Sequence, residues 1–269
     1  MNATLEKNFE LFAQRISLSQ HELDNAIKRA EEICQFLSQA TVVQECKTTG
    51  SMARSTAIQD FSDVDIVAVL SPPLSAQDTP NSITARLLDI LRPTYREARI
   101  SENTVRISFA HGPDVDVIPA ILDTVSPNGG MIYKIPSPNR SRWNEYAPEE
   151  RNQEINQKSA LLGERFIRLI KIMKWWSKQH EQPVASYEIE NIASATFSSR
   201  MPPITHAIVE FFEFAESSPK GRRESHGTSI SDARSIANKA LQCEQQGDIR
   251  GALNYWGSLL GDRFSSVVS

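Results

Sequence analysis

The distribution of β-branched residues divides this sequence into two parts and restricts its fold more than any other feature. The runs that predict strands lie before residue 119, whereas only helical periodicity follows residue 148. We therefore predict an α+β protein, with a mixed-sheet lobe and N-terminal helices at 1–147 and an all-helical lobe at 148–269. The expected strands are 41–50, 63–70, 94–100, 104–109 and 114–118.

Helices are expected at the start of the chain and throughout its second half. Apolar residues at helical spacing predict a helix over 5–16, and Ser19 with Glu22 forms a capping box that opens a second one. Segment 119–148 is rich in Pro, Asn, Gly and Ser, so we expect a loop there and place the domain boundary at its end. Further helices are predicted at 83–91, 154–179, 188–197, 204–215, 232–246 and 249–260.

Composition narrows the class of protein. With 269 residues, 40% of them hydrophobic, the chain is too apolar for disorder, and its net charge of -4 argues against a protein held on nucleic acid by bulk charge. Cys34, Cys46 and Cys243 form no closely spaced pair, which argues against a disulfide framework or a cysteine zinc site. We find no secretion signal and no run of about 18 apolar residues, so we expect a cytoplasmic protein without a membrane span.

Two aspartates open the second predicted strand. Side chains two residues apart in a strand point the same way, so Asp63 and Asp65 share one face with Val67, while Val64 and Ile66 anchor the other. Two carboxylates aimed together repel each other unless a cation lies between them. Mg²⁺ prefers a few carboxylates together with water and substrate phosphates, so the pair suits a metal shared with a nucleotide.

A third carboxylate comes from a later strand. Asp114 and Asp116 also share a face, and Asp116 is the better candidate because valines flank it. Three carboxylates can hold two metal ions for an in-line phosphoryl displacement, and Gly50 with Ser51 would cradle the phosphates. The alternative is structural, since an Asp-x-Asp pair without such neighbours is common in surface strands and turns.

The helix predicted at 154–179 carries cations on one side. Apolar residues occupy about half of its helical wheel, and Lys171 lies at the centre of a cationic stripe on the opposite side. A lysine suits a point contact to phosphate, but an isolated basic stripe is more often a solvated surface. The stripe consists of Arg168, Lys171, Lys174 and Lys178.

The order and spacing of these motifs resemble a known superfamily. Gly-Ser at 50–51, an eleven-residue gap, DVD at 63–65 and DVDVIPA from Asp114 resemble the polymerase-β type of nucleotidyltransferase. More narrowly, GSMARSTAI, SDVDIV, NGGMIYKIPSP, LIKIMKWW and ASYEIE are similar to the cGAS/DncV-like nucleotidyltransferases of bacteria, the CD-NTases with a SMODS domain. The resemblance covers nearly the whole chain and implies a polymerase-β-like lobe followed by a helical lobe.

The resemblance also implies roles for individual residues. Two Mg²⁺ or Mn²⁺ ions would bind three aspartates, of which Asp116 also helps to deprotonate the attacking hydroxyl. Tyr187 would stack on a nucleobase, although its place before apolar positions at helical spacing also fits a core residue. The implied metal ligands are Asp63, Asp65 and Asp116, and the implied substrate-binding residues are Gly50, Ser51, Lys171, Ser186 and Tyr187.

The implied activity is synthesis of a cyclic di- or trinucleotide second messenger from nucleoside triphosphates, in antiphage (CBASS-type) signalling through a downstream effector. One alternative is an enzyme that adds nucleotides to RNA ends, and another is a non-catalytic nucleotide-binding regulator. The basic loop at 217–229 departs from the family pattern. The five scattered histidines form no cluster with cysteine, which argues against activation by DNA through a zinc insertion.

Overall fold

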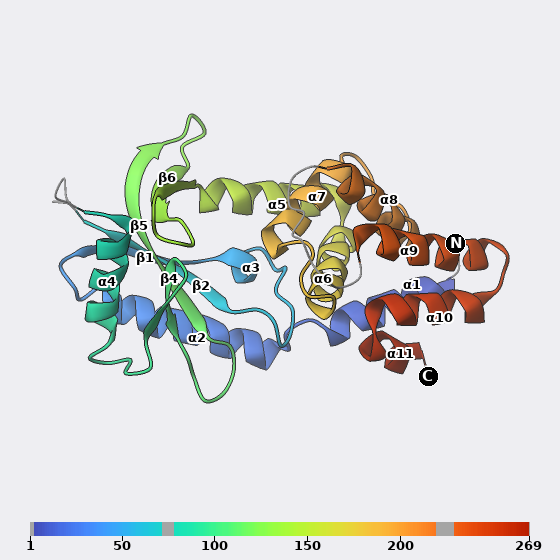
Figure 1. Cartoon of the computed structure of the whole chain (residues 1–269), viewed down its shortest axis with the longest axis horizontal. Helices are drawn as coiled ribbons and strands as arrows, with labels where there is room; N and C mark the ends of the chain where they lie inside the picture. Colours follow the sequence, from blue (N-terminus) through green and yellow to red (C-terminus); the bar gives the residue numbers. More distant parts are fainter. Residues whose placement is uncertain (1–2, 72–77, 219–228, 269) are drawn as a thin grey trace. The chain divides into compact units, whose positions relative to one another are not determined.

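The computed structural model describes residues 3–71, 78–218 and 229–268. Contacts divide the chain into a sheet unit, residues 18–154, and a helical unit, residues 1–17 with 155–269. The expected division fell after residue 147 and assigned the N-terminal helices to the first lobe, whereas here residues 1–17 belong to the helical unit. Each unit is described by itself below (Figure 1).

The sheet unit contains a mixed sheet, as predicted. Its strand order is β1-β2-β5-β4-β3, and β6 pairs with both β5 and β7. The β2 and β5 strands run parallel, while the other pairs are antiparallel. The strands are β1 (Val43–Thr49), β2 (Val64–Leu70), β3 (Arg99–Ser101), β4 (Thr104–Ile107), β5 (Val115–Val125), β6 (Met131–Pro136) and β7 (Trp143–Tyr146).

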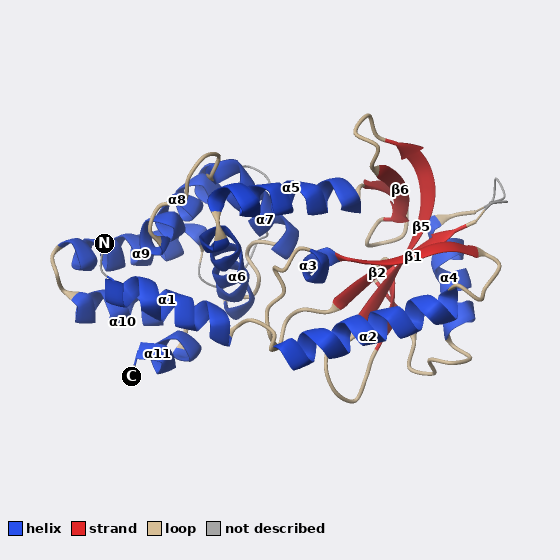
Figure 2. Ribbon diagram, turned by 180° about the vertical axis from the view of Figure 1, so that it is seen from behind, coloured by secondary structure: helices blue, strands red, loops and turns tan. Residues whose placement is uncertain are grey.

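The two faces of this sheet have different surroundings. Alternate residues of β2, among them Val64 and Ile66, pack with α2 (Gln20–Leu37) and α4 (Pro80–Leu91) in the larger core. Figure 2 shows α2 running along this side of the sheet. Val67 belongs to a smaller cluster that includes Tyr133. The predicted alternation is therefore confirmed, and the face of Asp65 and Val67 is the one opposite α2.

The helical unit is built around α1. Phe9 lies 5.2 Å from Trp256, Phe12 lies 5.3 Å from Phe264, and all four rings are fully buried. Because these partners come from the far end of the sequence, α1 is an integral helix of this unit. The helices are α1 (Ala3–Arg15), α5 (Pro148–Leu162), α6 (Glu164–Gln179), α7 (Ser186–Thr196), α8 (Ile204–Ser217), α9 (Ile230–Gln245), α10 (Ile249–Leu260) and α11 (Asp262–Val268), with α5 starting in the sheet unit.

Some predicted boundaries were wrong. Segment 119–148 is not a loop, because β5 continues to Val125 and β6 and β7 follow it. The helix expected over 154–179 is broken at Gly163, whose φ of 79° no regular right-handed helix permits. Of the strand expected at 94–100, only residues 99 and 100 are extended, as part of β3. The basic loop at 217–229 lies, apart from its ends, outside the described residues.

The cysteine prediction was also wrong. Cys34 on α2 and Cys46 on β1 form a disulfide with a Cα–Cα distance of 5.2 Å, and Cys243 is free. Spacing along the sequence did not indicate this pair, because the fold brings α2 against β1. The capping box of Ser19 and Glu22 is present as predicted. None of the described helices combines the length and the apolar composition needed to cross a membrane.

Candidate active site

The three predicted aspartates lie at one end of neighbouring parallel strands. Asp65 on β2 is directly opposite Asp116 on β5, and both are on the face away from α2. Asp63 lies just before β2, where the Val64 amide donates a hydrogen bond of 2.9 Å to the Asp114 carbonyl. The parallel pairing therefore holds the segments that carry the aspartates side by side.

Arg106 connects two of these carboxylates. It is opposite Asp116 in the antiparallel pairing of β4 with β5. One guanidinium nitrogen, Nη2, lies 2.5 Å from Asp63 Oδ2 and 2.6 Å from Asp116 Oδ2, while Nε donates to Asp116 Oδ1 at 2.9 Å. Thr104 Oγ1 also donates to Asp116 Oδ1, at 3.1 Å. The guanidinium thus neutralises charge that the clustered carboxylates would otherwise leave uncompensated.

Burial and the charge of Arg106 shift the pKa of Asp63 in opposite directions. Burial raises the pKa of the Asp63 carboxyl above its ordinary value, the Arg106 cation partly offsets that rise, and the Asp116 charge adds to it. The hydrogen bond to Asp116 raises the pKa of the Arg106 guanidinium. Arg106 therefore remains a cation at any physiological pH.

Gly50 lies in direct contact with the third aspartate. Its φ is 71°, and a Cβ placed on it would be 1.8 Å from Asp65 Oδ2. Gly50 begins the short helical turn α3 (Gly50–Ala53), in which Ser51 is half-buried. Beside them, the Tyr146 hydroxyl lies 3.0 Å from Thr49 Oγ1, and burial raises the pKa of Tyr146. The missing side chain at Gly50 is what leaves room for the Asp65 carboxylate.

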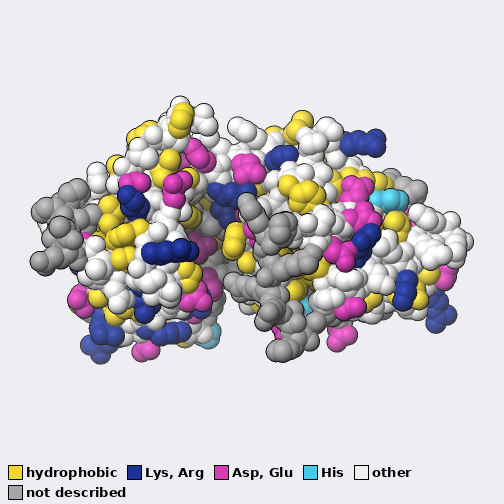
Figure 3. All heavy atoms as spheres, turned by 45° about the horizontal axis from the view of Figure 1, so that its top comes forward, with side chains coloured by type: hydrophobic (Ala, Val, Ile, Leu, Met, Phe, Trp, Pro, Cys, Tyr) yellow, Lys and Arg dark blue, Asp and Glu magenta, His cyan; other side chains and the backbone are white. Residues whose placement is uncertain are grey.

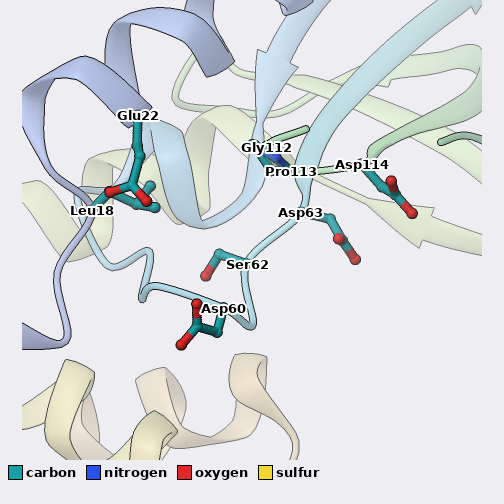
Figure 4. Close-up of a pocket in the computed structure, with 8 residues that line it drawn as sticks. All are labelled: Leu18, Glu22, Asp60, Ser62, Asp63, Gly112, Pro113 and Asp114. Carbon is teal, nitrogen blue, oxygen red and sulfur yellow. The ribbon is translucent and has the colours of Figure 1, made fainter. Parts of the chain in front are cut away.

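A pocket of about 440 Å³ adjoins Asp63. Figure 4 shows Asp63 and Asp114 on the adjacent segments that lead into β2 and β5. Asp114 accepts hydrogen bonds from the Ser108 hydroxyl and the Phe109 amide, which assigns it to the turn before β5. The pocket is lined by Leu18, Glu22, Asp60, Ser62, Asp63, Gly112, Pro113 and Asp114.

The donor set fits a divalent cation. Asp63 and Asp116 already share one positive group, and carboxylate oxygens are the ligands that Mg²⁺ prefers. Within 3–71, 78–218 and 229–268, no three or more His, Cys, Asp or Glu side chains are arranged to hold a metal ion. Arg106 contacts oxygens of both Asp63 and Asp116, so in this arrangement the guanidinium lies where a metal would share these ligands.

The remaining predicted residues lie in the helical unit. Lys171 on α6 donates to the Ser17 hydroxyl at 2.9 Å, and burial lowers the pKa of its ammonium. Ser186 and Tyr187 open α7. Tyr187 is 63% exposed, so the alternative that it is a core residue is wrong. The structure does not bring Lys171 into a hydrogen bond with Ser186.

The predicted cationic stripe of this helix is not a free surface. Lys174 is buried and forms an ion pair of 2.8 Å with Glu190, which is also buried. Arg168 lies 3.3 Å from Glu10 on α1. Periodicity alone could not show this, because the carboxylates come from α1 and α7. Lys171 differs from these two cations in having a neutral partner.

Sequence reasoning missed Arg106 and Thr104. A charged residue in the run TVRIS, at a position whose alternate neighbours are polar, was the available signal. The pairing register that puts Arg106 opposite Asp116 was needed to interpret it.

A mixed sheet with facing aspartates on adjacent parallel strands, and a Gly-Ser turn against one of them, defines the fold of a nucleotidyltransferase lobe. The chain belongs to the family of the Second Messenger Oligonucleotide or Dinucleotide Synthetase (SMODS) domain, which residues 3–159 match. The predicted family resemblance is therefore confirmed.

Individual relatives are distant in sequence. The chain is 24% identical over 197 residues to a probable cyclic nucleotide synthase of Bacillus cereus (strain VD146), covering 65% of this chain and 59% of that protein. Its fold matches E. coli MS115-1 CdnC, solved with ATP, at a TM-score of 0.78 and 18% identity, over 96% of this chain and 98% of the other. It also matches the Bradyrhizobium diazoefficiens CD-NTase CdnG, solved with GTP, at a TM-score of 0.70 and 12% identity, over 98% of both chains.

Proposed function

We propose that this protein is a metal-dependent nucleotidyltransferase that joins nucleoside triphosphates into a cyclic di- or trinucleotide second messenger. The observation that carries the proposal is the placement of Asp65 opposite Asp116, with Asp63 tied to Asp116 through Arg106. The family supports it, as do the ATP and GTP with which the similar structures were solved. Signalling against phage from the cytoplasm, through an effector that recognises the product, completes the proposal.

The chain's own groups account for the reaction as follows. Asp63, Asp65 and Asp116 hold two Mg²⁺ or Mn²⁺ ions, which when bound supply Lewis-acid stabilisation of the charge that develops on the phosphate. Asp116 orients the attacking ribose hydroxyl and accepts its proton. The hydroxyl oxygen bonds to the α-phosphorus of the second nucleotide as the bond to pyrophosphate breaks. Further transfers by the same groups, each releasing pyrophosphate, close the ring: a second for a dinucleotide and a third for a trinucleotide.

The other predicted residues bind substrate. Gly50 and Ser51 donate hydrogen bonds to the triphosphate, and Lys171 and Ser186 contact its phosphates. Tyr187, which is 63% exposed, offers a face on which a nucleobase stacks. Lys171 suits an anion, because its ammonium is already partly desolvated and lacks a carboxylate within ion-pair distance among the described residues.

The RNA-end alternative requires a basic track along which RNA could lie. On the face drawn in Figure 3, the lysine and arginine side chains of the described residues are interspersed with acidic ones. Together with the net charge of -4, this favours small anionic substrates over a nucleic-acid strand. The non-catalytic alternative leaves the clustering of three carboxylates without a purpose.

The test is product formation. The purified protein is incubated with all four ribonucleoside triphosphates and Mg²⁺ or Mn²⁺, treated with phosphatase and analysed by mass spectrometry. We expect a phosphatase-resistant product with the mass of a cyclic oligonucleotide. Linear products, or products that form only when RNA is added, would support the RNA-end alternative instead.

A matched pair of variants tests the assignment of Asp116. Asp116→Asn should lower turnover at least about 100-fold, because it removes a metal ligand and proton acceptor. Asp123→Asn makes the same chemical change on the same strand, but Asp123 pairs with Lys134 away from the site. Turnover of this variant should therefore be unchanged. Full activity of Asp116→Asn, or of the double variant Asp63→Ala with Asp65→Ala, would refute the metal assignment.

A further inference from the structure

Arg106 occupies the position between two proposed metal ligands. Its side chain is 27% exposed, against 38% for Asp63 and 14% for Asp116, so the three groups meet in a partly desolvated place. Three of its contacts, all between 2.5 and 2.9 Å, are to oxygens of these two carboxylates. A divalent cation that coordinates these oxygens would therefore compete with the guanidinium for them.

We propose that Arg106 is an exchangeable counter-ion, which holds Asp63 and Asp116 together in the metal-free protein and gives up these contacts when a divalent cation binds. The inference rests on the proposed function, since it takes the two aspartates as metal ligands. The inference adds Arg106 as a residue that sets the concentration of divalent cation at which the enzyme binds metal. Arg106 is in this sense a positioning residue, which prepares the ligands and competes for them.

The contacts on each carboxylate indicate how the exchange can occur without loss of the strand geometry. Asp63 is engaged by Arg106 through Nη2 alone, whereas Asp116 also receives Nε and the Thr104 hydroxyl. The link to Asp63 can therefore break while Thr104 keeps Asp116 oriented. When a divalent cation takes the place of the guanidinium, two positive charges replace one, so the negative charge of the carboxylates is neutralised more fully.

The neighbouring strand offers a matched control. Arg99 on β3 lies directly opposite Arg106 in the pairing with β4, and its Nη1 donates to the Ser108 hydroxyl at 3.0 Å. It has the same charge, but it lies exposed on the edge strand. Its hydrogen-bond partner is Ser108 and not Asp63 or Asp116, so its removal should leave those two carboxylates in place.

The experiment measures metal affinity and stability in the absence of nucleotide. Mn²⁺ binding to the full chain is followed by electron paramagnetic resonance, and thermal unfolding is recorded in EDTA. Arg106→Gln should bind Mn²⁺ at least about tenfold more tightly than the unaltered protein, yet unfold at a lower temperature in EDTA, because the carboxylates then repel each other. Arg99→Gln should change neither value.

The outcomes separate this inference from the proposed function. Equal or weaker Mn²⁺ binding by Arg106→Gln would overturn the counter-ion role, as would the absence of binding to both proteins at millimolar Mn²⁺. Mn²⁺ binding that persists in Asp63→Asn with Asp116→Asn would refute the metal assignment itself. If Arg106→Gln does not fold, Arg106→Lys replaces it, since a lysine keeps the charge without the two-nitrogen contact and should bind Mn²⁺ with intermediate affinity.

Discussion

Gly50 restricts the site at the scale of one residue. Its positive φ and its contact with Asp65 are independent requirements, and each excludes a side chain there. Gly129 meets only the first requirement. Gly129, in the turn between β5 and β6, has a φ of 83° and open space around the position of a Cβ.

Gly50→Ala should therefore abolish activity, while Gly129→Ala should not. Both changes introduce backbone strain of about 1–2 kcal/mol, but only the first displaces the Asp65 carboxylate. We expect turnover of Gly50→Ala to fall at least about 100-fold, with melting temperatures of the two variants within a few degrees of each other. Comparable turnover in the two variants would show that the contact with Asp65 is unimportant.

The same substitution at two lysines one turn apart on α6 should change the free energy of unfolding in opposite directions. Lys174→Met leaves Glu190 buried without its cation and should lower the free energy of unfolding by about 3–5 kcal/mol. Lys171→Met removes a partly buried ammonium and should raise it slightly, by less than about 1 kcal/mol, while weakening nucleotide binding. Calorimetry and a nucleotide titration measure both effects. Destabilisation by Lys171→Met would contradict this interpretation.

The lowered pKa of Lys171 predicts that the stability of the protein depends on pH. Burial holds the pKa of Lys171 in the folded protein below its ordinary value of 10.5, so the unfolded chain binds more protons between the two values. The free energy of unfolding therefore rises with pH across that interval. The advantage of Lys171→Met over the unaltered protein should be greatest below the interval and should vanish above pH 10.5. A constant difference in melting temperature from pH 7 to 11 would count against the assignment.

The faces of the aspartates could be predicted from sequence because a strand has a strict period of two. The Arg106 contact and the Lys174 pair could not, because each depends on which strand or helix comes to lie opposite. Lys174 looked like part of a surface stripe until α7 supplied Glu190. The sequence thus predicts what lies along one element and fails where two elements meet.

At the scale of elements, the pairing of α2 with β1 is reinforced covalently. Cys34 and Cys46 are 12 residues apart and pack against the larger core. The position of β1 matters for the site, since β1 leads into Gly50 and pairs with the strand that carries Asp65. Breaking this connection should loosen the side of the sheet that precedes the Gly-Ser turn.

Cys34→Ala with Cys46→Ala should lower the free energy of unfolding by roughly 3 kcal/mol, the value for closing a loop of this length in the unfolded chain. Unfolding curves with and without reductant should show the same loss for the unaltered protein. Cys243→Ser, at the free cysteine, serves as the control and should retain the response to reductant. Identical curves in both conditions would mean that the two thiols are not bonded in solution.

Element prediction failed where a local signal was ambiguous. Prolines and glycines in segment 119–148 indicated a loop, yet β6 and β7 form there because they pair with each other and with β5. By contrast, the helices of the second half were predicted well, since their apolar faces repeat at the helical period. Gly163 shows the limit of that signal, because apolar spacing did not indicate the positive φ that separates α5 from α6.

At the scale of the whole molecule, successive helices at the start of the chain belong to different units. Phe9 on α1 is buried in the helical unit, and Ile33 on α2 is buried in the sheet unit. The sequence could not reveal this division, because α1 and α2 are adjacent in it. The aromatic partners of α1 appear only more than 150 residues later.

Substitutions in the two helices should therefore affect different parts of the protein. Phe9→Ala should destabilise the helical unit by about 3–5 kcal/mol, and Ile33→Ala the sheet unit by about 2–5 kcal/mol. Hydrogen exchange followed by mass spectrometry should show faster exchange in α6, α10 and α11 for Phe9→Ala. For Ile33→Ala the faster exchange should lie in β1, β2 and α4. Faster exchange throughout the sheet in Phe9→Ala would contradict the division.

The packing of α1 also affects how the protein matures on the ribosome. Roughly 250 residues separate α1 from α11, and at 5–20 residues per second this is on the order of 10–50 s of synthesis. During the earlier part of that time the sheet unit can fold, whereas α1 has no aromatic partner until Trp175 on α6 has been made, and its pairs with α10 and α11 form only at the end. We therefore expect α1 to be the segment that chaperones bind on the nascent chain. Slower translation would prolong that exposure and reduce the yield of mature protein.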